Sequence, residues 1–196
     1  MHEKIGAFKA HVREISANPD FVHHKWFVEW HLELVERIAK ELLVHYAEAD
    51  KELVEVMVWL HDYGKIIDFD HQYDRKLLDI GRDKLLELGF ADGFANKAAD
   101  YIEWMDKKLE VDLRQAPIEI QVVSSADGCS HLVGPFMQLW WYENANKPFD
   151  ELMADNKRKA QKDWNHKIVL PEARAAFEPR FNHMMEQSGE LPEKFL

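Results

Sequence analysis

The sequence contains few of the residues that cross-link a chain or turn it. It has one cysteine, Cys129, which excludes an internal disulfide framework and a cysteine-built zinc cage. Gly (8) and Pro (7) are scarce among the 196 residues, so turns are few and helices are favoured. No short segment shows the apolar and polar alternation, rich in β-branched residues, that marks a strand. These absences predict an all-α protein.

Two further absences concern positive charge and long hydrophobic runs. The 25 basic residues are outnumbered by 36 acidic ones, and a formal net charge of −11 disfavours binding to a nucleic acid polymer. A local basic pocket for one small phosphate ester remains compatible with that charge. No run approaches the ~18–20 apolar residues of a membrane span, and the start (MHEKIGAFKAHVREIS) lacks the apolar core of a signal peptide. We therefore expect a cytoplasmic protein that does not bind membranes.

The spacing of apolar residues predicts a compact, single-domain bundle of about seven to nine helices. The length is sufficient for one domain with a buried core. Gly64 is expected to end the third helix, and the apolar run 137–142 suits a helix-packing face or a homodimer face. The predicted helices cover residues 3–16, 22–47, 51–62, 74–88, 91–107, 117–131, 149–163 and 171–187, with a loop over 65–73.

The adjacent pair His61-Asp62 follows an apolar helical segment, VMVWL. A buried carboxylate such as Asp62 costs several kcal/mol unless it is paired or binds a metal. Neighbouring side chains on a helix point about 100° apart, so both can reach one ion only at the end of the helix. Gly64 lets the chain turn away at that point.

His31 and Asp127 are the predicted partners of this pair. His31 shares an apolar stripe with Val28, where a histidine is either a hydrogen-bonded core residue or a ligand. Asp127 continues the inner stripe of Ile120 and Val123, and its carboxylate also needs compensation. Two imidazoles and two carboxylates suit Mn, Fe, Co, Ni, Zn or Mg, with positions left for water and substrate.

The order His31, His61-Asp62, Asp127 resembles the H…HD…D signature of the HD-domain superfamily of metal-dependent phosphohydrolases. The segments WHLELVERIAKEL, LHDYGK, IGRDKLLELGF and IQVVSSADGCSHL resemble the corresponding segments of that superfamily. The resemblance covers roughly residues 25–135. It implies an HD core over about 22–135, with C-terminal helices from 136–196 packing on this core within a single domain, 1–196.

The sequence departs from the dinuclear members of this superfamily, which carry additional histidines after the HD dipeptide. Leu77 and Leu78 occupy the neighbourhood of one such histidine, and residues 103–105 (Glu-Trp-Met) that of another. We therefore predict one divalent metal ion, of undetermined identity, on His31, His61, Asp62 and Asp127. Glu103 remains a candidate replacement as an oxygen ligand.

The resemblance implies hydrolysis of a phosphate ester, of a small metabolite or a nucleotide, by a metal-activated water. The alternatives are an iron oxygenase or a lyase of the same fold, or a non-catalytic metal-containing binding module. The candidate catalytic or substrate-binding residues are Lys65, Asp68, His71, Arg82 and His131, and His24 is a candidate for the pocket rim. Each also has a purely structural interpretation, such as a helix-end lysine, a solvated loop or a buried histidine. The tryptophans are interpreted as core residues rather than as platforms for a nucleobase.

Overall fold

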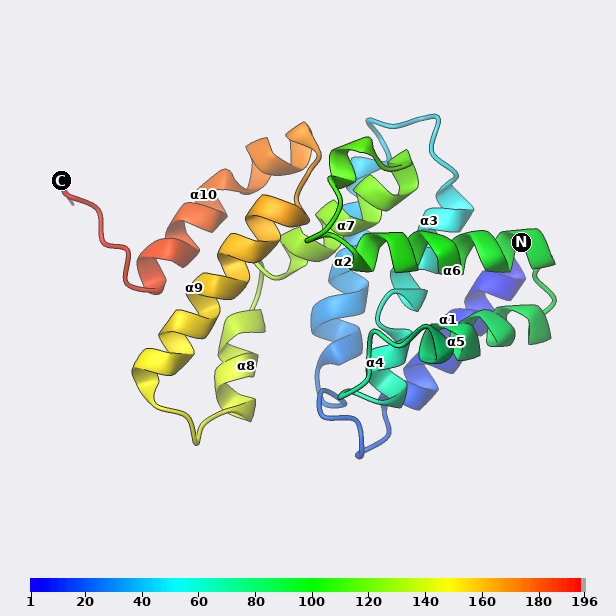
Figure 1. Ribbon diagram of the computed structural model, residues 1–196, viewed down its shortest axis with the longest axis horizontal. Helices are drawn as coiled ribbons and strands as arrows, with labels where there is room; N and C mark the ends of the chain where they lie inside the picture. Colours follow the sequence, from blue (N-terminus) through cyan, green and yellow to red (C-terminus); the bar gives the residue numbers. More distant parts are fainter. Residues whose placement is uncertain (195–196) are drawn as a thin grey trace.

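Residues 1–194 are described by a computed structural model, and they fold into helices alone (Figure 1). No strand occurs among these residues, which confirms the all-α prediction. None of their helices combines the length and the apolar character that crossing a membrane requires. The helices are α1 (His2–Ser16), η1 (Val28–Leu32), α2 (Glu33–Leu42), α3 (Lys51–Leu60), α4 (Tyr63–Ile67), α5 (Arg75–Glu87), α6 (Asp92–Asp106), η2 (Leu113–Gln115), α7 (Ile118–Ser130), α8 (Phe136–Glu143), α9 (Phe149–His166) and α10 (Pro171–Gln187).

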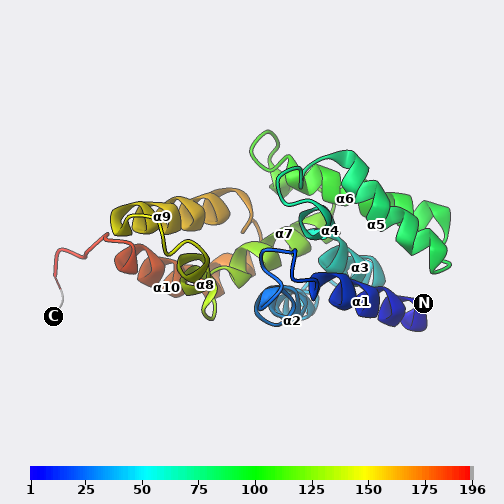
Figure 2. The same cartoon turned by 90° about the horizontal axis from the view of Figure 1, so that it is seen from below.

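Helix α7 forms the centre of the molecule. Nearly every side chain from Glu119 to Ser130 is buried. The helix packs against α2, α3 and α6 as well as against α9 and α10. Both ribbon views place α1–α6 to one side of α7 and α8–α10 to the other (Figures 1 and 2). Side chains near the C-terminal end of α7 can therefore meet residues from both groups of helices.

Two helix ends follow directly from local chemistry. The Asp50 carboxylate accepts a hydrogen bond from the backbone N–H of Leu53 at 3.0 Å, so it caps α3. After α5, Gly89 adopts a φ of +81°, a conformation that side-chain-bearing residues rarely adopt. These two residues fix where α3 begins and where the chain leaves α5.

The prediction of one long helix over 22–47 is wrong. The chain makes turns up to Trp26, passes through the π-helix η1 and continues as α2, which ends at Leu42. The backbone N–H of Glu33 donates to the carbonyl oxygen of Val28, so one extra residue is inserted in this turn. An apolar stripe fits both windings, and for that reason its spacing alone could not reveal the π-helix. His31 lies within it.

The prediction of a loop over 65–73, with Gly64 as the helix stop, is also wrong at its start. The chain breaks at Asp62, with φ −110° and ψ 17°, and Gly64 and Lys65 then lie within the short helix α4. A Cβ atom on Gly64 would lie 2.5 Å from the carbonyl oxygen of Gln72. Glycine is therefore required here because the following loop packs closely on α4, and not because a helix ends.

Glu36 joins the first three α-helices through a partly buried charge cluster. Its carboxylate accepts hydrogen bonds from Lys9 of α1 at 2.9 Å and from the indole N–H of Trp59 in α3 at 2.7 Å, and it also pairs with Lys40. Burial favours the neutral acid, but Lys40, Lys9 and Trp59 together lower the pKa of Glu36 from 4.5 to about 2. The ionised carboxylate is therefore bound more favourably in the folded state than in the unfolded chain.

We expect Glu36→Gln to lower the free energy of unfolding at pH 7 by about 2 kcal/mol. Because the folded-state pKa is depressed, this stabilisation is present above about pH 4.5 and is lost as the pH falls toward 2. Urea unfolding at neutral and acidic pH should show that the gap between variant and wild type shrinks by more than half by about pH 3. Glu33→Gln, at an exposed pair with Arg13, is the control. A gap that does not change with pH would contradict this account.

Candidate metal centre

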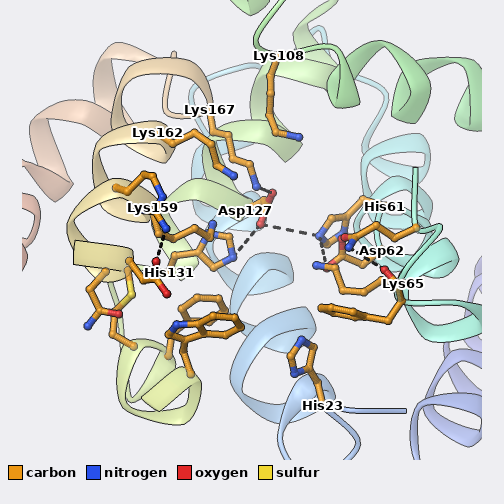
Figure 3. Close-up of a pocket in the computed structure, with 18 of the residues that line it drawn as sticks. His23, His61, Asp62, Lys65, Lys108, Asp127, His131, Lys159, Lys162 and Lys167 are labelled. Atoms are coloured by element: carbon orange, nitrogen blue, oxygen red, sulfur yellow. Dashed lines mark hydrogen bonds and ion pairs between the residues drawn. The ribbon is translucent and has the colours of Figure 1, made fainter. Parts of the chain in front are cut away.

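The four predicted ligands come from four different segments and converge on one point. His31 lies in η1, His61 follows the last residue of α3, Asp62 forms the break before α4, and Asp127 lies in α7. The Nε2 atoms of His31 and His61 are 3.2 Å apart, and the His31 Nε2 is also 3.2 Å from the Asp62 Oδ2. The Asp127 Oδ1 lies 3.9 Å from both imidazole Nε2 atoms. Figure 3 shows Asp127 facing His61.

Hydrogen bonds on the far side of each ring determine which imidazole nitrogen carries the proton. The His61 Nδ1 lies 2.7 Å from the carbonyl oxygen of Val58, which can only accept, so Nδ1–H is the donor. The Ser130 hydroxyl donates to the main-chain oxygen of Asp127 at 2.7 Å and therefore accepts from the His31 Nδ1 at 3.2 Å. In their neutral forms both rings consequently direct the Nε2 lone pair into the site.

This arrangement suits a cation. The Nε2 atoms of His31 and His61 lie 3.2 Å from each other, and the Asp62 and Asp127 oxygens lie 3.2–3.9 Å from these nitrogens. Burial lowers the pKa of His31, which disfavours an imidazolium as the compensating charge. Burial alone would favour neutral acids, but Lys65 and Lys167 hold the pKa values of Asp62 and Asp127 well below their usual range. The donor set therefore fits a divalent metal ion with mixed nitrogen and oxygen ligands.

Each ligand carboxylate also has a lysine behind it. The Lys65 ammonium donates to the Asp62 Oδ2 at 2.6 Å, and the Lys167 ammonium donates to the Asp127 Oδ2. Burial disfavours the charge of Lys167, but Asp127 and Asp163 raise its pKa above the ordinary 10.5, so it stays protonated. Both carboxylates are thereby held ionised and fixed in orientation.

His131, just after α7, extends the site. Its ring stacks on that of His31 with centroids 5.2 Å apart, and its Nε2 lies 3.3 Å from the Asp127 Oδ1. Its Nδ1 lies 2.8 Å from the Oδ2 of Asp163, a fully buried carboxylate of α9, and also 2.8 Å from the Lys159 ammonium. A proton on Nδ1 would bond to Asp163, whereas an unprotonated Nδ1 would accept from Lys159. Burial lowers the pKa of His131 to about 3, so the ring is neutral at pH 7. Among the described residues, His31, His61 and Asp62 form one group that is close enough to hold an ion, and His31, Asp127 and His131 form a second.

A cavity of about 480 Å³ opens beside these residues. Its apolar wall includes Trp26, Phe69, Phe136 and Trp140. Although the chain as a whole is acidic, seven cationic side chains line the cavity against four carboxylates. The cations are Lys65, Lys108, Lys147, Arg158, Lys159, Lys162 and Lys167, and the carboxylates are Asp62, Asp106, Asp127 and Asp155.

Two of the further predicted residues, Lys65 and His131, line this cavity, and five do not. Asp68 and His71 pair with each other at 2.9 Å in a solvent-exposed loop. The other three bond to partners outside the cavity. Arg82 pairs with Asp79 and Asp83, and Glu103 pairs with Arg75 and Lys107. The His24 ring bonds to the Phe21 carbonyl oxygen. Glu103 is thus neutralised by two cations and is not among the groups that could hold an ion.

Sequence reasoning missed the charged residues that line the cavity from α9 and from the residue that follows it. In KRKAQKDWNHK, Lys162 and Asp163 of α9 lie three and four residues after Lys159, and Lys167 lies four residues after Asp163. That spacing places charges on one helix face, but such a face is usually solvated, and only the packing of α9 beside α7 directs it into the cavity. Trp26 and Trp140 likewise line the cavity, where packing in the core was expected.

The helices and the side-chain geometry define an all-helical protein with a histidine–aspartate cluster that could hold a metal ion. A family model for the HD domain matches residues 28–132, which is more than half of the chain and includes all four candidate ligands. The chain therefore belongs to the HD-domain superfamily, whose members are mostly metal-dependent hydrolases. Neither a search among curated proteins nor one among solved structures gave a match. The cationic residues of α9 lie beyond the matched segment.

Proposed function

We propose that the protein hydrolyses a phosphate ester of a small metabolite or a nucleotide at a mononuclear metal centre. The observation that carries this proposal is the juxtaposition of His/Asp groups that could hold a metal ion with a cation-lined cavity. A divalent ion held by His31, His61, Asp62 and Asp127 supplies acidification of water and neutralisation of phosphoryl charge.

The residues of the chain contribute orientation, charge and a proton acceptor. Lys65 and Lys167 hold Asp62 and Asp127 in their ionised forms, as their contacts require. In the tautomer with the proton on Nδ1, directed at Asp163, the His131 Nε2 at the cavity wall, 3.3 Å from Asp127, can accept a proton from the attacking water. The Asp163 carboxylate on its Nδ1 stabilises the imidazolium that results. These roles support hydrolysis more directly than oxygen chemistry.

The cavity also supports a small substrate. A volume of about 480 Å³ lies within the usual range for small-molecule sites. Its aromatic wall offers an apolar surface for the organic part of an ester, while the lysines offer partners for its phosphate. A nucleic acid polymer remains disfavoured by the net charge of −11.

The test is turnover of a panel of phosphomonoesters and nucleotides by the metal-depleted protein after it is loaded with Mn, Co, Ni or Mg. We expect release of inorganic phosphate from at least one ester, its loss on chelation and its return when metal is restored. Metal content measured in parallel should be one ion per chain. A fully loaded protein that cleaves no ester, or one that binds two irons and consumes oxygen, would contradict the proposal.

A further inference from the structure

Three lysines from different parts of the chain direct their ammonium groups into the same part of the cavity. Lys108 follows α6, Lys162 lies on α9, and Lys167 follows α9. Figure 3 shows the three side chains approaching one another beside Asp127. Lys108 is only 9% exposed, and burial, followed by the charge of Lys167, lowers its pKa, while Asp106 and Asp127 oppose this shift. Like charges therefore face one another in a partly desolvated space.

The carboxylates of the cavity do not neutralise this cluster. Lys167 is already bonded to Asp127, and the nearest carboxylate oxygen to the Lys108 ammonium is that of Asp106, at 3.7 Å. Lys162 forms no ion pair with any carboxylate of residues 1–194, whereas its helix neighbour Lys159 is bonded to Asp163. Of these three lysines, only Lys167 is therefore hydrogen-bonded to a carboxylate. Lys108 has the 3.7 Å contact with Asp106 alone, and Lys162 has no carboxylate partner among residues 1–194.

The charge of the whole cavity leads to the same conclusion. Seven cations and four carboxylates leave an excess of three positive charges, and a divalent ion raises this excess to five. Counting Asp163, which pairs with Lys159 and Lys167, and Glu151, which pairs with Lys147, reduces it to three. A phosphate monoester carries about two negative charges at neutral pH. One such group on the metal therefore leaves about one positive charge unbalanced.

We propose that Lys108 and Lys162 form a subsite for a second anionic group of the substrate. The ligand is then a small phosphate ester that carries another phosphate or a carboxylate, with one phosphate at the metal ligands and the second group between these lysines. The subsite uses a residue of α9, beyond the segment that the HD-domain model matches, so substrate choice resides partly in the C-terminal helices. The inference rests on the proposed function for its reaction, but the binding can be measured without turnover.

The test uses calorimetric titration of the metal-loaded protein with non-hydrolysable phosphonates. The probes are propylphosphonate, propane-1,3-diyl bisphosphonate and 3-phosphonopropionate, which share one phosphonate and differ in the second group. We expect the bisphosphonate to bind at least about tenfold more tightly than propylphosphonate. The carboxylate probe shows which second anion the subsite prefers, and tighter binding of either doubly charged probe supports the subsite.

Substitutions then assign the preference to the lysines. Lys162→Gln should remove most of the preference for the second anionic group and change the Kd for propylphosphonate less than about twofold, and Lys162→Arg should restore it. Lys157→Gln is the matched control, because Lys157 lies on the same helix but pairs with Glu190 outside the cavity. Lys162 is only partly buried, so its replacement leaves the core intact.

The outcomes separate the subsite from the proposed function. Wild-type protein that binds all three probes equally overturns the subsite, as does a preference that survives both Lys162→Gln and Lys108→Gln. If the preference depends on Lys162 while no ester is hydrolysed, the subsite stands and the proposed reaction fails. If esters are hydrolysed without any preference for a second anion, the reaction stands and the subsite is wrong.

Discussion

Replacing Asp62 with asparagine is expected to abolish metal binding and to lower hydrolysis by at least about a thousandfold. The Asp62 Oδ2 lies 3.2 Å from the His31 Nε2 and 3.6 Å from the His61 Nε2, so its charge is central to the donor set. A neutral amide removes this charge and leaves the Lys65 ammonium, bonded at 2.6 Å in the wild type, without its counterion. The variant therefore presents a site with too little negative charge for a divalent ion.

Metal content by elemental analysis and thermal unfolding with and without a chelator measure this effect together. A bound ion stabilises only the folded state, so chelation should lower the melting temperature of the wild type and leave that of Asp62→Asn unchanged. Asp20→Asn, at an exposed position before η1, controls for loss of a carboxylate elsewhere. If Asp62→Asn retains a full complement of metal, the assignment of this ligand is wrong.

Replacing His131 with glutamine is expected to lower kcat by about a hundredfold while metal content stays at one ion per chain. The reason is that the proton acceptor is lost, whereas the four ligands remain. Asp163→Asn should have a weaker effect of the same kind, about tenfold or more, because the amide no longer fixes the proton on the His131 Nδ1. Steady-state kinetics with metal analysis on the same samples measure both quantities.

His183→Gln on α10 serves as the control for this experiment, since His183 is exposed and does not line the cavity. A loss of metal that parallels the loss of activity in His131→Gln would show that His131 is a ligand, consistent with its place in the second group that could hold an ion. Unchanged kcat in His131→Gln would contradict a role for His131 in proton transfer.

The four candidate ligands could be chosen from the sequence because two of them are carboxylates next to apolar helical segments, where a charge needs compensation. Asp127 lies on the buried helix α7, whereas Asp62 lies at the break after α3. Helical phase then placed His31 and Asp127 on inner faces, and the structure brings both to the end of α3. Lys65 was within reach because it lies one turn after Asp62, and His131 because it lies four residues after Asp127.

The remainder of the site depends on packing that no local pattern reports. The π-helix changes the phase of the chain before His31, so His24, seven residues earlier, does not line the cavity, whereas His23 does. The lysines of α9 form a charged face that looks solvated in sequence, and they enter the site only because α9 packs beside α7. Asp163 escaped notice for the same reason, although it is fully buried and holds the His131 ring.

The most direct test of the metal centre is an anomalous difference map from crystals of the protein loaded with Mn or Co. We predict a single strong peak per chain, within about 2.0–2.3 Å of donor atoms of His31, His61, Asp62 and Asp127. The same map decides whether His131 faces the ion or the cavity. A peak elsewhere, two peaks at this site, or no peak despite full loading in solution would contradict a mononuclear centre on these residues.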